Sequence, residues 1–187
     1  FDTATGSDRA VVETLDVSAT GLPVSLRVQS ATGSGAVSVS LTTGSGTSLD
    51  QLYATTDHDE RVNQAGKPDL FFQSGVLSVT IPVDVAGETA RINIAYPNSV
   101  TANDQYFDAS SWQPITAEAY DVSGSISLAL TDGGIGDSDG AANNSISHLG
   151  ALGKPTIKYI DASVSLTPLT ETLRFSGDTA DCNVTYD

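Results

Sequence analysis

The chain has 187 residues, with 23 acidic and 8 basic side chains and a formal net charge of −15 at pH 7. This length suits one domain that buries a core without disulfide bonds. The charge argues against nucleic acid as a partner, since phosphates are bound by clustered Lys and Arg. No stretch approaches the roughly 18 apolar residues that a membrane-spanning helix needs, so no membrane insertion is expected.

Runs in which apolar and polar residues alternate recur along the chain, and a period of two indicates strands with one buried face. The strands expected first are residues 11–17, 22–28, 36–42, 76–81 and 90–95. Residues 50–55 are expected to form one helical turn capped by Asp50. Residues 114–122 and 125–130 indicate a hairpin around Ser123-Gly124, and further strands are expected at residues 157–166, 172–175 and 183–186.

Many short strands separated by turns of Gly, Ser, Asn and Asp predict an all-β fold. We expect an antiparallel β-sandwich of Ig-like or jelly-roll-like type with very little helix. Residues 1–187 are expected to form a single domain. Lys154-Pro155 marks a boundary, beyond which a C-terminal strand extension is expected.

The acidity of the chain has an unusual split, with 18 Asp and five Glu. Asp is poor in helix interiors but favourable in turns and in cation-binding loops. This split therefore favours hard cations as partners, or simply solubility in a saline medium.

Residues 131–144, TDGGIGDSDGAANN, form the segment that we call the acidic loop. Its glycines allow positive φ angles that turn main-chain carbonyls inward. Calcium takes roughly six to eight oxygen ligands from carboxylates, amides, carbonyls and water. The loop therefore predicts a Ca²⁺ site formed by Asp132, Asp137, Asp139 and Asn143. The alternative is an Asp/Gly turn between two strands, with its carboxylates in solvent.

A second acidic cluster, Asp57-His58-Asp59-Glu60, lies in the long polar segment 55–69. Asp57 and Asp59 are candidates to add ligands to a cation site, and the alternative is a solvated loop, where charge runs usually lie. His58 and His148 are the only histidines and Cys182 is the only cysteine, which is too few for a standard zinc site.

The acidic loop and its flanks also resemble a known family. Residues 130–146, LTDGGIGDSDGAANNSI, are similar to the signature of the bacterial choice-of-anchor U domain, LTDGG-x-GD-x-DG-x-x-N-G-x-I. The resemblance covers roughly residues 70–150. It includes Phe71-Phe72, the strand that follows them, and a segment containing Tyr106, Phe107 and Trp112.

Two positions depart from that signature. Asn144 stands where the family has Gly, and residues 147–153 replace its Asp-Pro-Gly-Gly stretch. The resemblance implies a domain of a large secreted or surface-anchored bacterial protein, with no enzymatic activity attached.

These observations together predict an extracellular or cell-surface module. We expect a non-catalytic structural or adhesion domain of a larger bacterial protein, monomeric, stabilised by Ca²⁺, with a surface protein or a glycan as partner. A Gly-x-Ser-x-Gly pattern occurs at residues 136–140, GDSDG, but it lies late in the chain, in the acidic loop, and no Asp-x-x-His partner accompanies it. No enzymatic activity is therefore expected. Cys182 is either an ordinary thiol or the partner of a cysteine outside this chain.

The alternative function is a carbohydrate-binding module. Aromatic residues concentrate between positions 96 and 120, and an exposed aromatic row stacks on sugar rings. Trp112, Tyr106 and Tyr96 are the candidate ligand-binding residues. The competing interpretation places these side chains in the core of a domain that has few other large residues.

Overall fold

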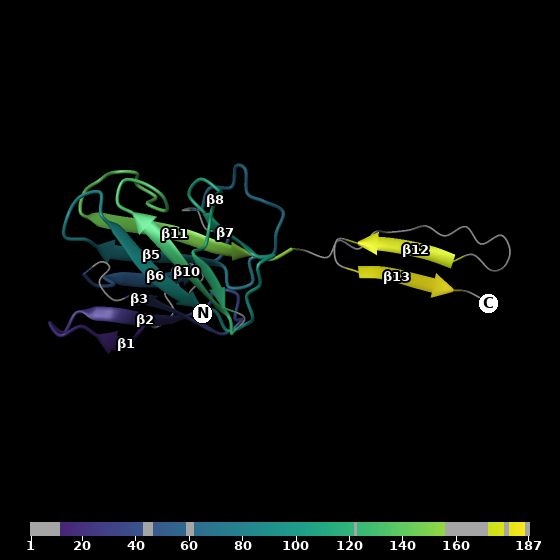
Figure 1. Cartoon of the computed structure of the whole chain (residues 1–187), viewed down its shortest axis with the longest axis horizontal. Helices are drawn as coiled ribbons and strands as arrows, with labels where there is room; N and C mark the ends of the chain where they lie inside the picture. Colours follow the sequence, from purple (N-terminus) through teal and green to yellow (C-terminus); the bar gives the residue numbers. More distant parts are fainter. Residues whose placement is uncertain are drawn as a thin grey trace, which may run out of the picture. The chain divides into compact units, whose positions relative to one another are not determined.

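The computed structural model describes residues 12–42, 47–58, 62–121, 123–155, 172–177 and 180–185. Its contacts divide the chain into two units, Phe1–Lys154 and Pro155–Asp187. We call the first unit the body; it contains β1 to β11 (Figure 1). The division falls between Lys154 and Pro155, where the sequence places a boundary. The strand predicted at 157–166 lies outside the described residues.

The body consists of two antiparallel sheets (Figure 1). The six-stranded sheet has the order β1 (Glu13–Val17), β2 (Pro23–Gln29), β3 (Ala36–Leu41), β6 (Thr89–Ala95), β10 (Ser125–Thr131), β9 (Ala119–Asp121). The five-stranded sheet has the order β4 (Gln51–Thr55), β5 (Val76–Pro82), β11 (Ser145–Gly153), β7 (Gln105–Asp108), β8 (Gln113–Ile115). The prediction of an all-β sandwich is confirmed, and the described residues contain no helix.

The main core lies between the two sheets and is built from alternate residues of their strands. Its central members from the six-stranded sheet are Ala90, Ile92 and Ile94 of β6 with Ile126, Leu128 and Leu130 of β10. The register places Ile126 opposite Ile94 and Leu128 opposite Ile92. From the five-stranded sheet come Leu77, Val79 and Ile81 of β5. Burying one such side chain contributes about 1.5–3 kcal/mol, so this layer is the main source of the body's stability.

A second core lies on the other face of the five-stranded sheet. Val76 precedes Leu77 in β5, and successive residues of a strand point to opposite faces. The second core contains Val76, Phe107, Leu149 and Ala151 from strands, and Val62, Phe72, Ala109 and Trp112 from connections. The connection between β4 and β5 thus supplies a hydrophobic cover for this sheet, which accounts for the length of that segment.

Two local predictions are wrong, and one strand was not predicted. Residues 50–55 do not form a helical turn, because Leu52 and Ala54 alternate with less buried residues and β4 pairs with β5. The expected strand 114–122 is instead two short strands, β8 and β9, in different sheets, and only β9 pairs with β10 as the predicted hairpin requires. β11 is a long central strand that no prediction included.

The second unit contains a hairpin of β12 (Thr172–Gly177) and β13 (Ala180–Thr185). Its register places Leu173 opposite Val184 and Phe175 opposite Cys182. Both interpretations of Cys182, an ordinary thiol or the partner of a cysteine outside this chain, stay predictions.

Within the part of the chain that the structure describes, no helix has the length and hydropathy that a membrane crossing requires.

Candidate functional site: the acidic loop

Asp132 is the first residue after β10, and its carboxylate fastens the acidic loop to the rest of the body. Oδ2 accepts hydrogen bonds from the main-chain N–H of Gly87 at 2.9 Å and of Asn144 at 3.0 Å. Oδ1 accepts from the N–H of Asn143 at 3.1 Å. The residue is only 2% exposed. One carboxylate thus connects the turn between β5 and β6, the end of β10 and the start of β11.

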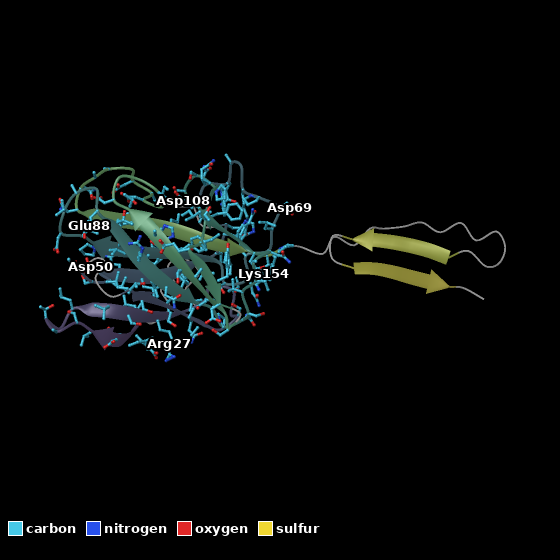
Figure 2. The ribbon with its side chains drawn as sticks, viewed as in Figure 1. Arg27, Asp50, Asp69, Glu88, Asp108 and Lys154 are labelled. Carbon is cyan, nitrogen blue, oxygen red and sulfur yellow. The ribbon has the colours of Figure 1, made fainter. Side chains whose placement is uncertain are left out.

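Figure 2 shows Glu88, the residue after Gly87, at the same end of the body as the acidic loop, with Lys154 at the opposite end. The main-chain N–H of Asp132 donates to the carbonyl of Glu88 at 3.0 Å. Main chain and side chain of Asp132 therefore both bind the turn between β5 and β6.

The charge state of Asp132 follows from these contacts. Burial acts to raise its pKa, but hydrogen bonds from the main-chain N–H groups of Gly87, Asn143, Asn144 and Ser145 outweigh burial and lower the pKa below its ordinary value. Hydrogen bonds to the charged form of a carboxyl favour that form. Asp132 is therefore a carboxylate at neutral pH, with its charge directed at N–H donors.

Asp137 closes the loop from within. Its Oδ2 accepts from the N–H of Gly133 at 2.7 Å, and its Oδ1 accepts from the N–H of Ser147 in β11 at 2.9 Å. The side chain is buried, with 6% of the residue exposed. Asp137 therefore joins the first turn of the loop to the strand that follows the loop.

Asp139 and Asn143 lie on the exposed side of the loop. Asp139 Oδ1 accepts from the N–H of Ala141 at 2.8 Å, and Oδ2 accepts from Asn143 Nδ2 at 3.2 Å. Asn143 Oδ1 in turn accepts from the N–H of Ser145 at 3.1 Å. These two side chains shape the tip of the loop, and Asp139 is the loop carboxylate that solvent reaches.

The four predicted calcium ligands are thus brought into one loop, each with hydrogen-bond donors as partners. Among the described residues, no three His, Cys, Asp or Glu side chains gather in a group that could hold a metal ion. Carboxylate and amide oxygens are the ligands that a hard cation such as Ca²⁺ prefers. Calcium binding stays a prediction, and main-chain hydrogen bonds already account for the folded shape of the loop.

In the second acidic cluster, the carboxylate of Asp57 pairs with a lysine side chain. Asp57 forms an ion pair with Lys67, and its main-chain carbonyl accepts from Gln64 Nε2 at 2.9 Å. Lys67 Nζ also lies 5.8 Å from the centre of the Phe72 ring, in the second core. Asp57 therefore anchors the cover over the second core. The other predicted ligand, Asp59, lies outside the described residues.

Asn144 has a φ of 69°, in the left-handed region. Gly adopts this region freely, and Asn tolerates it better than most residues with a side chain. This conformation gives a physical reason why Asn can stand at a position where the resembling signature has Gly. Its Nδ2 donates to the carbonyl of Asp84 at 3.0 Å, which adds another contact between the loop and the end of β5.

The aromatic residues do not form the exposed row that a sugar-stacking face requires. Trp112 is 5% exposed, and its ring centre lies 5.1 Å from that of Phe72 and 6.2 Å from that of Phe107. Tyr96 and Tyr106 are buried in the main core, on the opposite face of the five-stranded sheet from Trp112. The expectation of a common aromatic face is wrong, because the sheet separates Trp112 from the two tyrosines.

One polar cluster next to the loop was not predicted. His148 of β11 hydrogen-bonds both Tyr106 and the main-chain carbonyl of Gly136 in the acidic loop. The signal available in the sequence was the inward alternation of residues 146, 148 and 150, which places a histidine in the core once β11 is recognised.

Comparison with protein-family models, with curated proteins and with solved structures finds no match to this chain.

Proposed function

We propose that this chain is a non-catalytic structural or adhesion module of a larger bacterial surface or secreted protein, working outside the cell. The observation that carries the proposal is the use of the buried carboxylates. Asp132 and Asp137 direct their oxygens at main-chain N–H groups, so their charge stabilises a loop. The same loop carries the resemblance to the choice-of-anchor U domain, which supports a role in a surface protein.

Two other buried carboxylates serve the fold in the same way. Asp104 accepts from the N–H of Thr101 at 2.9 Å and lies 3.5 Å from Lys154 Nζ. Asp108 accepts from both the N–H and the hydroxyl of Ser110, at 2.9 and 2.6 Å. A general acid or base must have its proton within reach of a substrate. These carboxylates instead stabilise turns, which supports a structural role.

The proposal predicts no turnover of generic ester, peptide or glycoside substrates. The purified chain is assayed beside an Asp137→Asn variant, which would lose activity if Asp137 were an acid or base. Turnover by the wild type that the variant lacks would overturn the non-catalytic assignment. Contaminating activity would be equal in the two preparations, so the pair separates it from activity of the chain.

Stabilisation by Ca²⁺ is proposed for the same loop, because its carboxylate and amide oxygens are of the kind that Ca²⁺ binds. A ligand that binds only the folded state stabilises it by about 2.7 kcal/mol at a hundredfold excess over Kd. The expected result is a higher melting temperature in millimolar Ca²⁺ than in EDTA. Asp139→Asn should reduce this shift, because Asp139 is the exposed carboxylate of the loop. Identical melting curves in Ca²⁺ and EDTA would rule the ion out.

A further inference from the structure

The side chain of His148 connects the acidic loop to β7. Its Nδ1 lies 2.7 Å from the carbonyl oxygen of Gly136, and its Nε2 lies 2.9 Å from Tyr106 Oη. A carbonyl oxygen only accepts, so Nδ1 carries the hydrogen and Nε2 accepts from the Tyr106 hydroxyl. Both side chains are 1% exposed. The contacts therefore specify one neutral tautomer of a buried imidazole.

Gly150 makes room for this pair. A Cβ atom at position 150 would lie 2.0 Å from Tyr106 Oη and 2.3 Å from His148 Nε2. The two rings lie nearly parallel, with centres 5.7 Å apart and planes 25° from each other. The tyrosine–histidine contact thus depends on a glycine directly beside it in the same strand.

The titratable groups around His148 come from two elements. Tyr106 and Asp108 face it from β7, and Asp137 faces it from the acidic loop. Burial lowers the pKa of His148, while the Gly136 carbonyl and the charges of Asp108 and Asp137 act in the opposite direction and only moderate that effect. Next to Tyr106 lies Tyr96, whose buried hydroxyl has no hydrogen-bond partner among the described residues.

We propose that His148 is an acid-sensitive latch that holds the acidic loop, through Gly136, to Tyr106 of β7. A proton added to Nε2 turns this nitrogen into a donor that faces the Tyr106 hydroxyl, which is itself donating. The hydroxyl must then turn its hydrogen away within the core, and the imidazolium remains buried. Acidification therefore weakens the connection between loop and sheet.

The direction of the pH dependence follows from proton binding. An unfolded histidine titrates near pH 6.5, and the folded His148 titrates lower. Below about pH 6.5 the unfolded state therefore binds more protons, and stability falls as pH falls. One such proton lowers the folding equilibrium constant by up to about tenfold per pH unit. The stabilisation is complete above pH 6.5.

Urea unfolding between pH 8 and pH 5, with EDTA present to exclude a calcium effect, tests the latch. The wild type should lose stability as the pH falls below about 6.5, with a slope of at most one proton. His148→Gln should remove this slope. His58→Gln is the matched control, because the His58 side chain is 80% exposed, and it should behave as the wild type does. A wild type with constant stability over this range, or a His148→Gln variant that keeps the slope, would overturn the proposal.

A second pair of variants applies if His148→Gln does not fold. Tyr106→Phe removes the hydroxyl that donates to Nε2, so the neutral imidazole is less favoured and the slope should become shallower, while burial of His148 still contributes. Tyr96→Phe removes a neighbouring hydroxyl without a partner among the described residues and should leave the slope unchanged. Equal slopes in the two variants would show that the tyrosine–histidine bond is not the acid-sensitive contact.

Discussion

Replacing Trp112 by Ala is expected to lower the free energy of unfolding by about 3–5 kcal/mol, the usual cost of truncating a large buried aromatic side chain. Trp112 packs between Phe72 and Phe107 in the second core. Its Nε1 donates to the main-chain carbonyl of Asn63, in the connection that covers this core. The variant therefore loses both packing and the hydrogen bond that holds the cover.

The backbone of Trp112 adds to this cost. Its φ of 54° lies in the left-handed region, where the backbone of residues other than Gly and Asn is strained. Ala keeps this strain, and it keeps the 2.6 Å hydrogen bond from the main-chain N–H of residue 112 to the carbonyl of Asp108. It loses the ring contacts with Phe72 and Phe107 that offset the strain in the wild type. The native turn at Trp112 is therefore expected to be the first part of the second core to loosen.

Urea unfolding measures this effect, and Phe71→Ala is the matched control. Phe71 is an aromatic neighbour of the same core that is 54% exposed. Its truncation should change stability by about 0.5 kcal/mol or less, as is usual at exposed sites. A Trp112→Ala variant as stable as Phe71→Ala would show that Trp112 does not stabilise the second core.

Asp132→Asn is expected to have the largest effect of any substitution in the acidic loop. Three main-chain N–H groups surround the two carboxylate oxygens of Asp132. An Asn side chain offers one oxygen, and its amide nitrogen would face at least one N–H donor. A buried donor without an acceptor costs more than the hydrogen bond itself contributes. The melting temperature should fall by several degrees at pH 7.

Asp139→Asn is the control, since Asp139 is exposed and should change the melting temperature little in EDTA. The pH dependence separates Asp132 from His148. A carboxyl whose folded pKa is lowered stabilises the fold above its unfolded value, near 3.8, and this stabilisation is lost as pH falls further. Asp132→Asn should therefore reduce the loss of stability below about pH 4 and leave the slope near pH 6 unchanged. Equal loss in both variants below pH 4 would contradict the role of Asp132.

The sequence predicted those parts of the fold that depend on alternation. Val37 and Val39 of β3 are separated by a serine, and the inward residues of β10 by Ser127 and Ala129, so these strands could be recognised without knowledge of their partners. β4 and β11 were missed for opposite reasons. β4 is short and begins after a good helix cap, and β11 is buried on both faces in its second half, so it lacks polar alternation.

The sequence indicated a loop in which carboxylates matter, but it did not indicate the hydrogen-bond partners of those carboxylates. Asp residues among glycines favour both cation sites and turns closed by main-chain N–H groups. Which of the two forms depends on whether the fold places main-chain N–H groups beside the carboxylates. For Asp132 one of these groups is the N–H of Gly87, in a turn 45 residues away in the sequence. The burial of Trp112 was likewise set by the distant segment that covers it.

That 45-residue separation also bears on kinetics. The bond between Asp132 and Gly87 requires β6 and β10 to pair, because Gly87 lies just before β6 and Asp132 just after β10. Contacts that are absent from the folding transition state act mainly on the rate of unfolding. The carboxylate at this corner is therefore placed to determine how long the folded domain persists once formed. For a domain proposed to work outside the cell, this lifetime is the more useful measure of stability.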